Sequence, residues 1–511
     1  MHPALEILEI QEGIFCHYYH HGYTTPDLVA LACTCKTFQE PALDLIWRFE
    51  TSLRRFLNLF PEDAFIRGEK GDWFRVVRPL RPLVKADFER FSFYANRVRS
   101  FVFPEENTQH LDEILGAMAP CLSAGCLFPN LRSINFRHAD VSWIRFFISK
   151  KLTEIWHQYR KPCAGLAFIA PAAPILEHLS ISSPWHQGVD EDIPVVSALV
   201  QQTRQLFYLS TRTLSWDALV HLSNMLSLRR LTLHELALDA QPMTRLGPFT
   251  RLENLDFQIA PTSRLFGFLR LLSTPLAIKS FHIGVRDDIA AGSGRIHDML
   301  ADHLDHTCLC DIRLSIASYS PAEHIQTISR SALLRLHVFS NLTSLELHAA
   351  RRITLTEGLL ETLTRAWPRL EIFRLITQNT PDDPENQTKL PLRALQQFAK
   401  HCQRLRTLEI MFDATIPLPP PEDEGVVQTA LTELRVSFSP ISDSDTAQVA
   451  GYLFHLFPNI ATLFYQLNSL LHILPGPNDR RRRTVGQHRP DRPGWTGVAG
   501  HLQGLHKAKE G

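Results

Sequence analysis

Apolar residues recur along this chain in a six-residue pattern, apolar-x-x-apolar-x-apolar, where x is any residue. The intervals between copies cluster at about 22 to 35 residues, near or somewhat above the period of a leucine-rich repeat. One copy would mean little because leucine is common, but many in succession predict an internal repeat. Ten well-formed copies begin at Leu131, Leu176, Leu228, Leu252, Ile278, Leu309, Leu342, Leu370, Leu405 and Leu431, a weaker one at Ile460 and a poor one at Leu206.

Each copy predicts a short strand whose apolar side chains are buried only when neighbouring copies stack on it. Segments between the copies, such as residues 215–226 and 392–402, have a helical pattern and would cover the convex side of the array. The sequence therefore predicts an α/β solenoid, an irregular leucine-rich-repeat array over residues 126–475.

Residues 1–60 are helical by periodicity. Ile7, Ile10 and Ile14 share one helical face, Pro26 fits the first position of a second helix, and a third helix is expected around residues 38–48. These helices carry more apolar surface than about 45 residues bury among themselves. The surface either packs on the rest of the chain or docks a partner. Residues 61–125 are expected to form a linking helical region.

The last segment, residues 476–511, is basic, rich in Gly and Pro and poor in aliphatic residues, which predicts disorder. Within it, the run Arg480–Arg483 fits a nuclear-import signal or an anion-binding patch. A solvated charge run is the favoured alternative.

Composition narrows the classes of function. The 511 residues include 53 Lys and Arg against 53 Asp and Glu, so net charge gives no reason to expect nucleic acid or an anionic membrane as partner. No apolar run reaches about 18 residues, so no membrane span is expected. Nine cysteines scattered along a long chain favour free thiols in a reducing compartment, the cytoplasm or the nucleus or both.

Catalytic and metal-binding signatures are weak. Phosphate-binding glycine loops, a G-x-S-x-G elbow and an H-E-x-x-H helix are all missing, so no enzyme and no cofactor is expected. An undetected hydrolase stays a distant alternative. Thiols and imidazoles gather near the N-terminus, but their spacing does not match the usual zinc patterns. Cys33 and Cys35 also lie on one predicted helix, where they point apart, so no metal site is expected.

The remaining candidate surface is the exposed face of the strands. In each copy, residues between the inward apolar positions point outward, and their mixed charges with few aromatics fit a protein or peptide partner better than nucleic acid. A merely solvated sheet would have a similar composition. The candidate substrate-binding residues are Arg230, His234, Asp256, His282, Arg313, Glu346, Arg374, Glu409 and Arg435.

The N-terminal stretch resembles an F-box, the small helical motif that binds the Skp-family adaptor of SCF ubiquitin ligases. The segment CKTFQEPALDLIW, residues 35–47, resembles the close of many fungal F-box motifs, which commonly continue into repeats of this kind. Residues 77–101 and 395–414 also resemble segments of the fungal group of F-box proteins with leucine-rich repeats. The usual Leu-Pro opening is His2-Pro3 here, and the polar segment between the first two helices is long.

The resemblance implies an N-terminal three-helix F-box followed by the repeat array. It implies a substrate-recognition subunit that docks the Skp-family adaptor, and through it a cullin-RING ligase, and holds an unknown protein substrate without a catalytic residue of its own. The alternative is a leucine-rich-repeat scaffold outside any ubiquitin ligase, whose N-terminal helices act as a cap. The adaptor-binding residues implied are Pro3, Leu5, Ile7, Ile14, Phe15, Leu28, Leu31, Cys35 and Leu43, whereas Phe38 and Trp47 are expected to join the motif to the body.

Overall fold

A computed structural model of the chain divides into two compact units, an N-terminal unit of Met1–Leu231 and a C-terminal unit of Thr232–Gly511. None of the helices it describes is long and apolar enough to cross a membrane. The structure describes residues 7, 10–11, 13–14, 25–67, 76–103, 111–122, 125–137, 141–158, 166, 168–182, 192–236, 244–286, 296–317, 330–349, 355–377, 388–418, 426–465 and 493–510.

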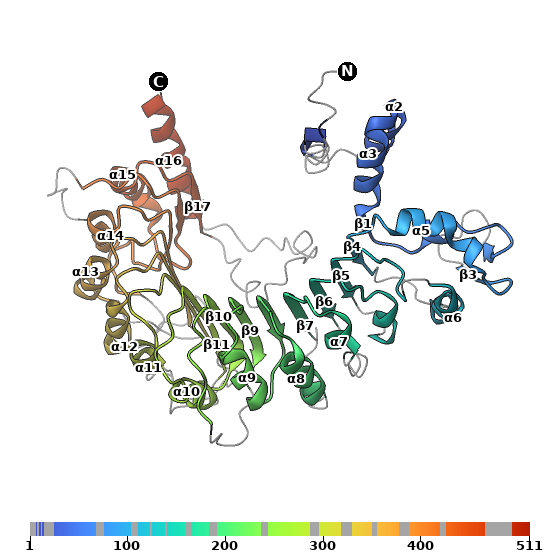
Figure 1. Cartoon of the computed structure of the whole chain (residues 1–511). Coiled ribbons are helices and arrows are strands. Elements are labelled where there is room, and N and C mark those ends of the chain that lie inside the picture. The colour runs from blue at the N-terminus through green and yellow to red at the C-terminus, as the bar shows by residue number, and fades with distance from the viewer. Residues whose placement is uncertain are drawn as a thin grey trace. The chain divides into compact units, whose positions relative to one another are not determined.

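In the N-terminal unit, helices α2 and α3 precede parallel strands that alternate with short helices (Figure 1), and residues 10–11 and 13–14 before them are also helical. Its parallel pairs run in the order β1-β4-β5-β6-β7-β8, and β2 and β3 form a separate antiparallel pair. The elements are α2 Thr25–Thr34, α3 Lys36–Arg48, β1 Phe49–Glu50, α4 Arg54–Leu57, β2 Phe65–Arg67, β3 Val76–Pro79, η2 Lys85–Phe88, α5 Glu89–Ala95, β4 Ser100–Val102, α6 Leu111–Met118, η3 Ala119–Cys121, β5 Ser133–Arg137, η4 Val141–Phe146, β6 Glu154–Gln158, α7 Ile169–Ala172, β7 His178–Ser182, α8 Asp192–Gln202, β8 Tyr208–Thr211 and α9 Trp216–Ser223.

Strand β9, Arg230–Glu235, lies at the division, and the C-terminal unit continues with strands β10 to β17, each pairing in parallel with the next. The parallel strands of the described residues number 15 in all. The remaining elements are β10 Asn254–Ala260, α10 Thr262–Arg270, β11 Ser280–Arg286, α11 Ile296–His303, β12 Asp311–Ala317, α12 Arg330–Arg335, η7 Leu336–Val338, β13 Ser344–Ala349, α13 Glu357–Ala366, β14 Ile372–Thr377, η9 Leu392–Leu395, α14 Gln396–His401, β15 Thr407–Glu409, β16 Glu433–Arg435, η10 Asp443–Asp445, α15 Thr446–Leu456, β17 Thr462–Phe464 and α16 Pro493–Glu510.

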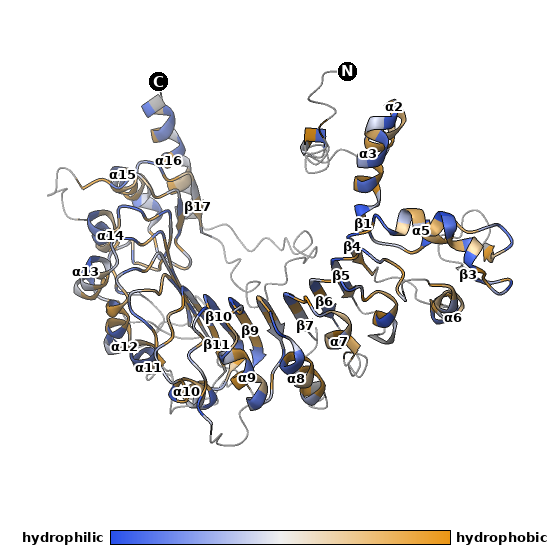
Figure 2. Cartoon of the chain, in the orientation of Figure 1, coloured by the Kyte–Doolittle hydropathy of each residue, from blue (hydrophilic) through white to orange (hydrophobic). Residues whose placement is uncertain are grey.

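The predicted α/β solenoid is confirmed, because every well-formed copy of the repeat pattern is a parallel strand. The apolar positions of a copy are buried, as Leu309, Ile312 and Leu314 show. Hydrophobic and hydrophilic residues alternate along the strands and across the helices, as Figure 2 shows. This alternation is the period of a strand with one buried face, and the helices cover that face.

The array starts earlier than the predicted boundary at residue 126. Strands β1 and β4 already pair in parallel, and Val98, Phe101 and Phe103 fill the three apolar positions of a copy that the search for leucine missed. The linking region of residues 61–125 is therefore not only helical, since it also contains β4 and the β2–β3 pair. Its aromatic side chains contribute to the buried core of the unit, with ring centroids of Phe88 and Phe91 5.5 Å apart.

The prediction of a disordered tail over residues 476–511 is wrong for residues 493–510, which form helix α16. Trp495, Val498 and Leu502 lie on one helical face and are buried. Helix α16 packs on α15 and η10. Gly494 lets the start of α16 approach Ile441 closely, since a β-carbon at Gly494 would lie 2.6 Å from Ile441 Cγ2. Tertiary packing thus stabilises a helix whose glycine content disfavours helix formation. The Arg480–Arg483 run lies outside the described residues.

Candidate functional site

Seven of the nine candidate residues of the strand face form a single row across the C-terminal unit. Each occupies the outward position between two buried residues of its strand, and the parallel register places each beside the next. We call this row the polar ladder; it runs through Asp256, His282, Arg313, Glu346, Arg374, Glu409 and Arg435 and ends beside Phe464 on β17.

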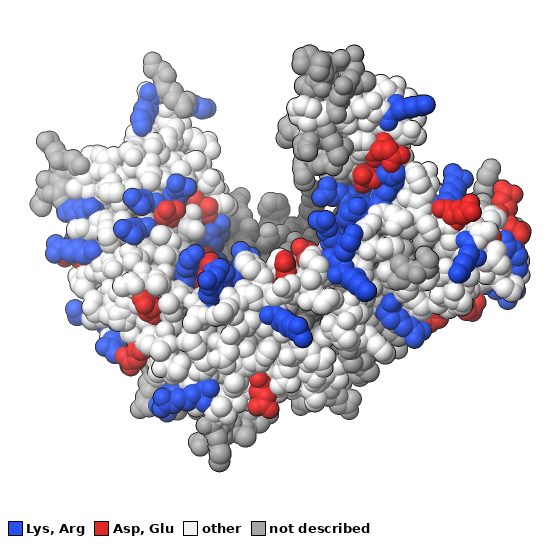
Figure 3. Space-filling model, in the orientation of Figure 1, with Lys and Arg blue, Asp and Glu red and all other residues white. Residues whose placement is uncertain are grey.

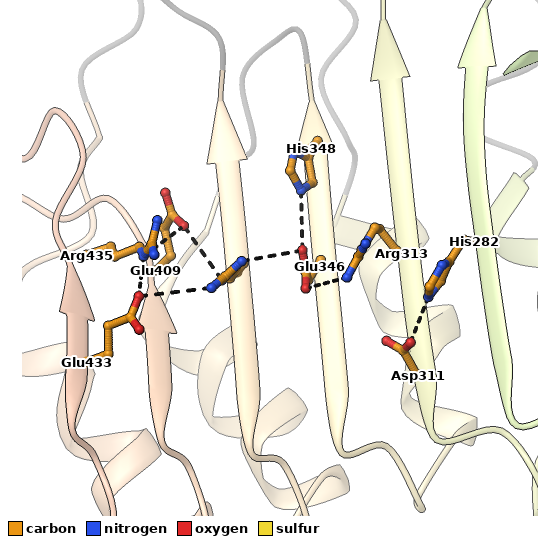
Figure 4. Close-up of polar contacts among 9 residues, drawn as sticks. His282, Asp311, Arg313, Glu346, His348, Glu409, Glu433 and Arg435 are labelled. Carbon is orange, nitrogen blue, oxygen red and sulfur yellow. Dashed lines mark hydrogen bonds and ion pairs between the residues drawn. The ribbon is translucent and has the colours of Figure 1, made fainter. Parts of the chain in front are cut away.

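The centre of the polar ladder is a chain of ion pairs (Figure 4). Arg313 Nη2 donates to Glu346 Oε1 over 3.0 Å, and Arg374 Nη1 lies 3.8 Å from Glu346 Oε2. Arg374 also extends toward the next strand, where its Nε is 4.0 Å from Glu409 Oε2. The register places residues of opposite charge side by side on neighbouring strands. Opposite charges in this position stabilise the pairing of the strands.

At the β17 end, Arg435 combines an ion pair with an aromatic contact. Its Nε is 4.0 Å from Glu409 Oε2 and also contacts Glu433, and its guanidinium lies 4.5 Å from the ring centroid of Phe464. Phe464 is itself exposed. A cation held over an exposed ring offers a flat, partly apolar contact to a partner.

At the opposite end, His282 joins the polar ladder to a second row of outward residues. His282 Nε2 and Asp311 Oδ2 are 2.7 Å apart, and Ser280 Oγ donates to the same carboxylate oxygen over 2.9 Å. Burial would raise the pKa of Asp311, but the contacts with His282, Ser344 and Ser280 lower it overall. The carboxylate therefore stays ionised.

The two buried glutamates of the polar ladder differ in electrostatic environment. Burial would raise the pKa of Glu346, but His348 and the charges of Arg313 and Arg374 lower it to about 2. For Glu409 burial dominates and raises the pKa, since the nitrogens of its arginine partners stand 4.0 Å away. Within the described part of the chain, Glu409 Oε2 has no hydrogen-bond partner. A donor from a bound partner would be favourable at this oxygen.

The other two candidates of the strand face lie outside the polar ladder. Arg230 is exposed at the start of β9 and belongs to the N-terminal unit, and His234 is half-buried further along the same strand. The candidate set omitted Asp311, Glu433 and Phe464. Alternation alone marks these residues as outward-facing, but only the register shows which of them touch the row.

The predicted adaptor-binding residues differ in exposure. Ile7 and Ile14 are exposed, whereas Leu28 on α2 is only 3% exposed and is covered within the chain. Leu31, Cys35 and Leu43 are half-buried. Pro3, Leu5 and Phe15 lie outside the described residues.

Two apolar residues that the candidate set omitted are also exposed on this part of the chain. Ile10 has 39% of its surface exposed and Val29, on α2, has 45%. The sequence could have identified Ile10, because helical periodicity places it on one face with Ile7 and Ile14. It could not have identified Val29, because the sequence does not show which face of α2 packs on α3.

Helix α3 is anchored to the rest of the N-terminal unit, and Trp47 contributes to this anchoring as expected. Leu45, Ile46 and Trp47 are buried, and the Trp47 ring lies 4.4 Å from Tyr94 and 5.1 Å from Phe56 between centroids. Phe38 is half-buried. Helix α3 thus packs on the body, whereas apolar side chains earlier in the chain lie in solvent.

Cys33 and Cys35 do not share a helix, which corrects the prediction. Cys33 lies in α2, whereas Cys35 has an extended backbone and caps the start of α3. Across the residues that the structure covers, His, Cys, Asp and Glu side chains form no group of three or more that is placed to hold a metal ion.

Comparisons with known proteins identify no family for this chain. No protein-family model matches it, and no curated protein matches it. Solved structures that align with it include a Rad7 and Elc1 complex in yeast, at 13% identity and a TM-score of 0.33 over 70% of this chain and 83% of the other. A TLR13-ssRNA13 complex aligns at 14% identity and a TM-score of 0.33, over 70% of this chain and 51% of the other.

A third aligned structure is the leucine-rich repeat-containing protein LegL7 from Legionella pneumophila. It aligns at 12% identity and a TM-score of 0.29, over 65% of this chain and 88% of the other. At TM-scores of this size the assignment of the fold rests on the strands themselves. They define a repeat array of the leucine-rich type, an architecture that provides an extended surface for binding.

Proposed function

We propose that this chain is the substrate-recognition subunit of an SCF-type ubiquitin ligase. Its N-terminal helices dock a Skp-family adaptor, and through it a cullin-RING ligase, while its repeats bind a protein substrate. The observation that carries the proposal is that α3 is anchored on the body while large apolar side chains before it are exposed.

Exposed apolar residues distinguish docking from capping. A cap would bury its apolar face within the chain, because its role is to cover the end of the repeats. Instead, Ile7, Ile10, Ile14 and Val29 each leave more than a third of their surface in solvent. Large apolar side chains left in solvent close together in the sequence favour an interaction surface over a cap.

Anchoring of α3 matters because a substrate receptor works by positioning. Trp47 packs between Tyr94 and Phe56, and Arg97 forms ion pairs with Glu40 and Asp44 on α3. A docked adaptor would then have a defined orientation relative to the N-terminal unit. Such a subunit raises the local concentration of substrate near the ubiquitin-loaded enzyme and supplies no catalytic residue.

The experiment is co-purification of the full chain with a Skp-family adaptor. The test variant is Ile10→Asp with Val29→Asp, since both residues are exposed and their replacement leaves the core intact. Leu28→Asp is unsuitable because a buried charge would unfold the helices. The control is Leu226→Asp, which changes a leucine of the same unit that is 69% exposed.

We expect the intact chain and Leu226→Asp to retain the adaptor and the double variant, folded by circular dichroism, to lose it. Retention by the folded double variant would overturn this docking surface. If the intact chain retains no adaptor, the ubiquitin-ligase function is refuted and the chain is a repeat scaffold with capped ends.

A further inference from the structure

Three arginines stand one above another where consecutive repeats of the N-terminal unit begin. The Arg99 amide donates to the Arg48 carbonyl oxygen over 2.9 Å, and the Arg132 amide donates to the Arg99 carbonyl oxygen over 2.8 Å. These backbone bonds place the three residues at the entrances of β1, β4 and β5, which pair in parallel. Adjacent strands are about 4.8 Å apart, so the row spans roughly 10 Å. We call it the arginine row.

The arginine row is not neutralised by the protein. Across the described residues, no ion pair links Arg48, Arg99 or Arg132 to a carboxylate, and Arg48 and Arg132 are exposed. Two acids of the preceding helix α3, Glu40 and Asp44, both form ion pairs with Arg97, and Arg97 Nη2 lies 2.5 Å from Glu40 Oε2.

The positive charges act on one another. Burial lowers the pKa of Arg99, and the charges of Arg132, Arg48 and Arg97 lower it further against the opposing effect of Asp44. The Arg99 side chain is held by the carbonyl oxygen of Asn96, over 2.7 Å, and cannot swing away without losing that bond. Figure 3 shows Lys and Arg side chains gathered over this part of the unit, around α3 and β4.

The arginine row is short. In the following repeats the same position holds Thr153 and then Glu177. The Thr153 carbonyl oxygen accepts a hydrogen bond from the Glu177 amide, and the Glu177 carbonyl oxygen accepts one from the Phe207 amide. Glu177 is exposed, so a negative charge closes the row. A nucleic-acid surface would continue the basic residues and interleave aromatic side chains for stacking.

We propose that the arginine row binds a short acidic segment of a protein partner, two or three carboxylates presented close together. The exposed guanidinium groups of Arg48 and Arg132 each present a fork of donors that matches a carboxylate, and Arg99 adds positive charge between them. The backbone hydrogen bonds hold the three residues in a fixed row. This site does not depend on adaptor docking, because it uses none of the exposed apolar residues of the N-terminal helices.

The probe is a fluorescent 12-residue peptide rich in Glu, measured by anisotropy with the full chain at low and at physiological salt. The test variant is Arg48→Glu with Arg132→Glu. The matched control is Arg204→Glu with Arg251→Glu, which makes the same change in net charge at two exposed arginines outside the arginine row.

We expect the test variant to bind the peptide at least tenfold more weakly than the wild type and the control to change less than threefold. Equal weakening in both variants would show a non-specific charge effect and overturn the site. A single-stranded oligonucleotide of equal charge should bind more weakly than the peptide. Tighter binding of the oligonucleotide through the same two arginines would overturn the assignment to an acidic peptide.

Discussion

The indole N–H of Trp495 donates a hydrogen bond to the backbone carbonyl oxygen of Ser439 over 2.8 Å, across 56 residues of sequence. Trp495 is fully buried and its ring stands edge-on to Phe412, with centroids 5.8 Å apart. Through this residue α16 becomes part of the C-terminal unit and covers α15 near the end of the repeats. Terminal repeats need such a cover, because no further repeat shields their apolar side chains.

Removing this anchor should destabilise the C-terminal unit. We expect Trp495→Ala to lower the free energy of unfolding by about 3 to 5 kcal/mol, the usual cost of truncating a buried tryptophan. Urea denaturation of the full chain measures the change. Gln503→Ala, at an exposed position of the same helix, should stay within about 0.5 kcal/mol of wild type. Similar stability of the two variants would show that α16 does not pack in solution.

The polar ladder should be sensitive to the loss of its central arginine. We expect Arg374→Ala to cost about 2 to 3 kcal/mol, because it removes positive charge from two buried glutamates at once. Adding Glu409→Gln should recover part of that loss, and a double-mutant cycle by urea denaturation measures the coupling. As a control, Arg365→Ala breaks the exposed pair with Glu361 and should change stability by less than about 0.5 kcal/mol. Equal effects at the two arginines would contradict a buried ladder.

Gly284 on β11 is required for a close backbone approach. A β-carbon at this position would lie 1.9 Å from the carbonyl oxygen of Gln258, beside the irregularity in β10 between Phe257 and Ala260. Since a backbone atom cannot yield as a flexible side chain does, we expect Gly284→Ala to lower thermal stability strongly.

The matched control for Gly284 is a glycine with free space. A β-carbon at Gly358 in α13 would meet no atom within 4 Å, so Gly358→Ala should raise stability by up to about 1 kcal/mol through helix propensity. Calorimetric scans of the two variants compare these effects. Equal stability of Gly284→Ala and wild type would mean that β10 and β11 do not approach this closely in solution.

Buried His297 should make the C-terminal unit sensitive to acid. Burial lowers its pKa from 6.5 to about 4, and neither ring nitrogen has a hydrogen-bond partner within the described residues. Between these values the unfolded chain binds the proton and the folded chain does not, so stability falls as the pH drops through this window.

The expected loss of unfolding free energy from this histidine is about 2 to 3 kcal/mol between about pH 7.5 and about pH 4.5. We expect His297→Leu to flatten that part of the dependence in urea denaturation, whereas His501→Leu, at an exposed position, should leave it unchanged. Parallel pH profiles for wild type and His297→Leu would contradict a neutral buried imidazole.

The sequence by itself determined the repeat array and the face that carries the polar ladder. Burial in a strand follows a period of two, so alternation along LTSLEL, residues 342–347, is enough to place Leu345 inside and Glu346 outside. It did not show that Arg313, Glu346 and Arg374 touch, because cross-strand neighbours depend on the register between residues about 30 positions apart.

Only the tertiary structure decided whether α16 is ordered and which side chains of α2 are buried. Helix α16 contains four glycines and owes its order to the burial of Trp495, Val498 and Leu502 against distant residues. In the same way, α2 is apolar on several sides, and only its packing on α3 decides that Leu28 is buried and Val29 exposed. Local propensity is a fraction of a kilocalorie per residue, whereas burying one large side chain contributes about 2 kcal/mol or more, so long-range packing prevails where the two disagree.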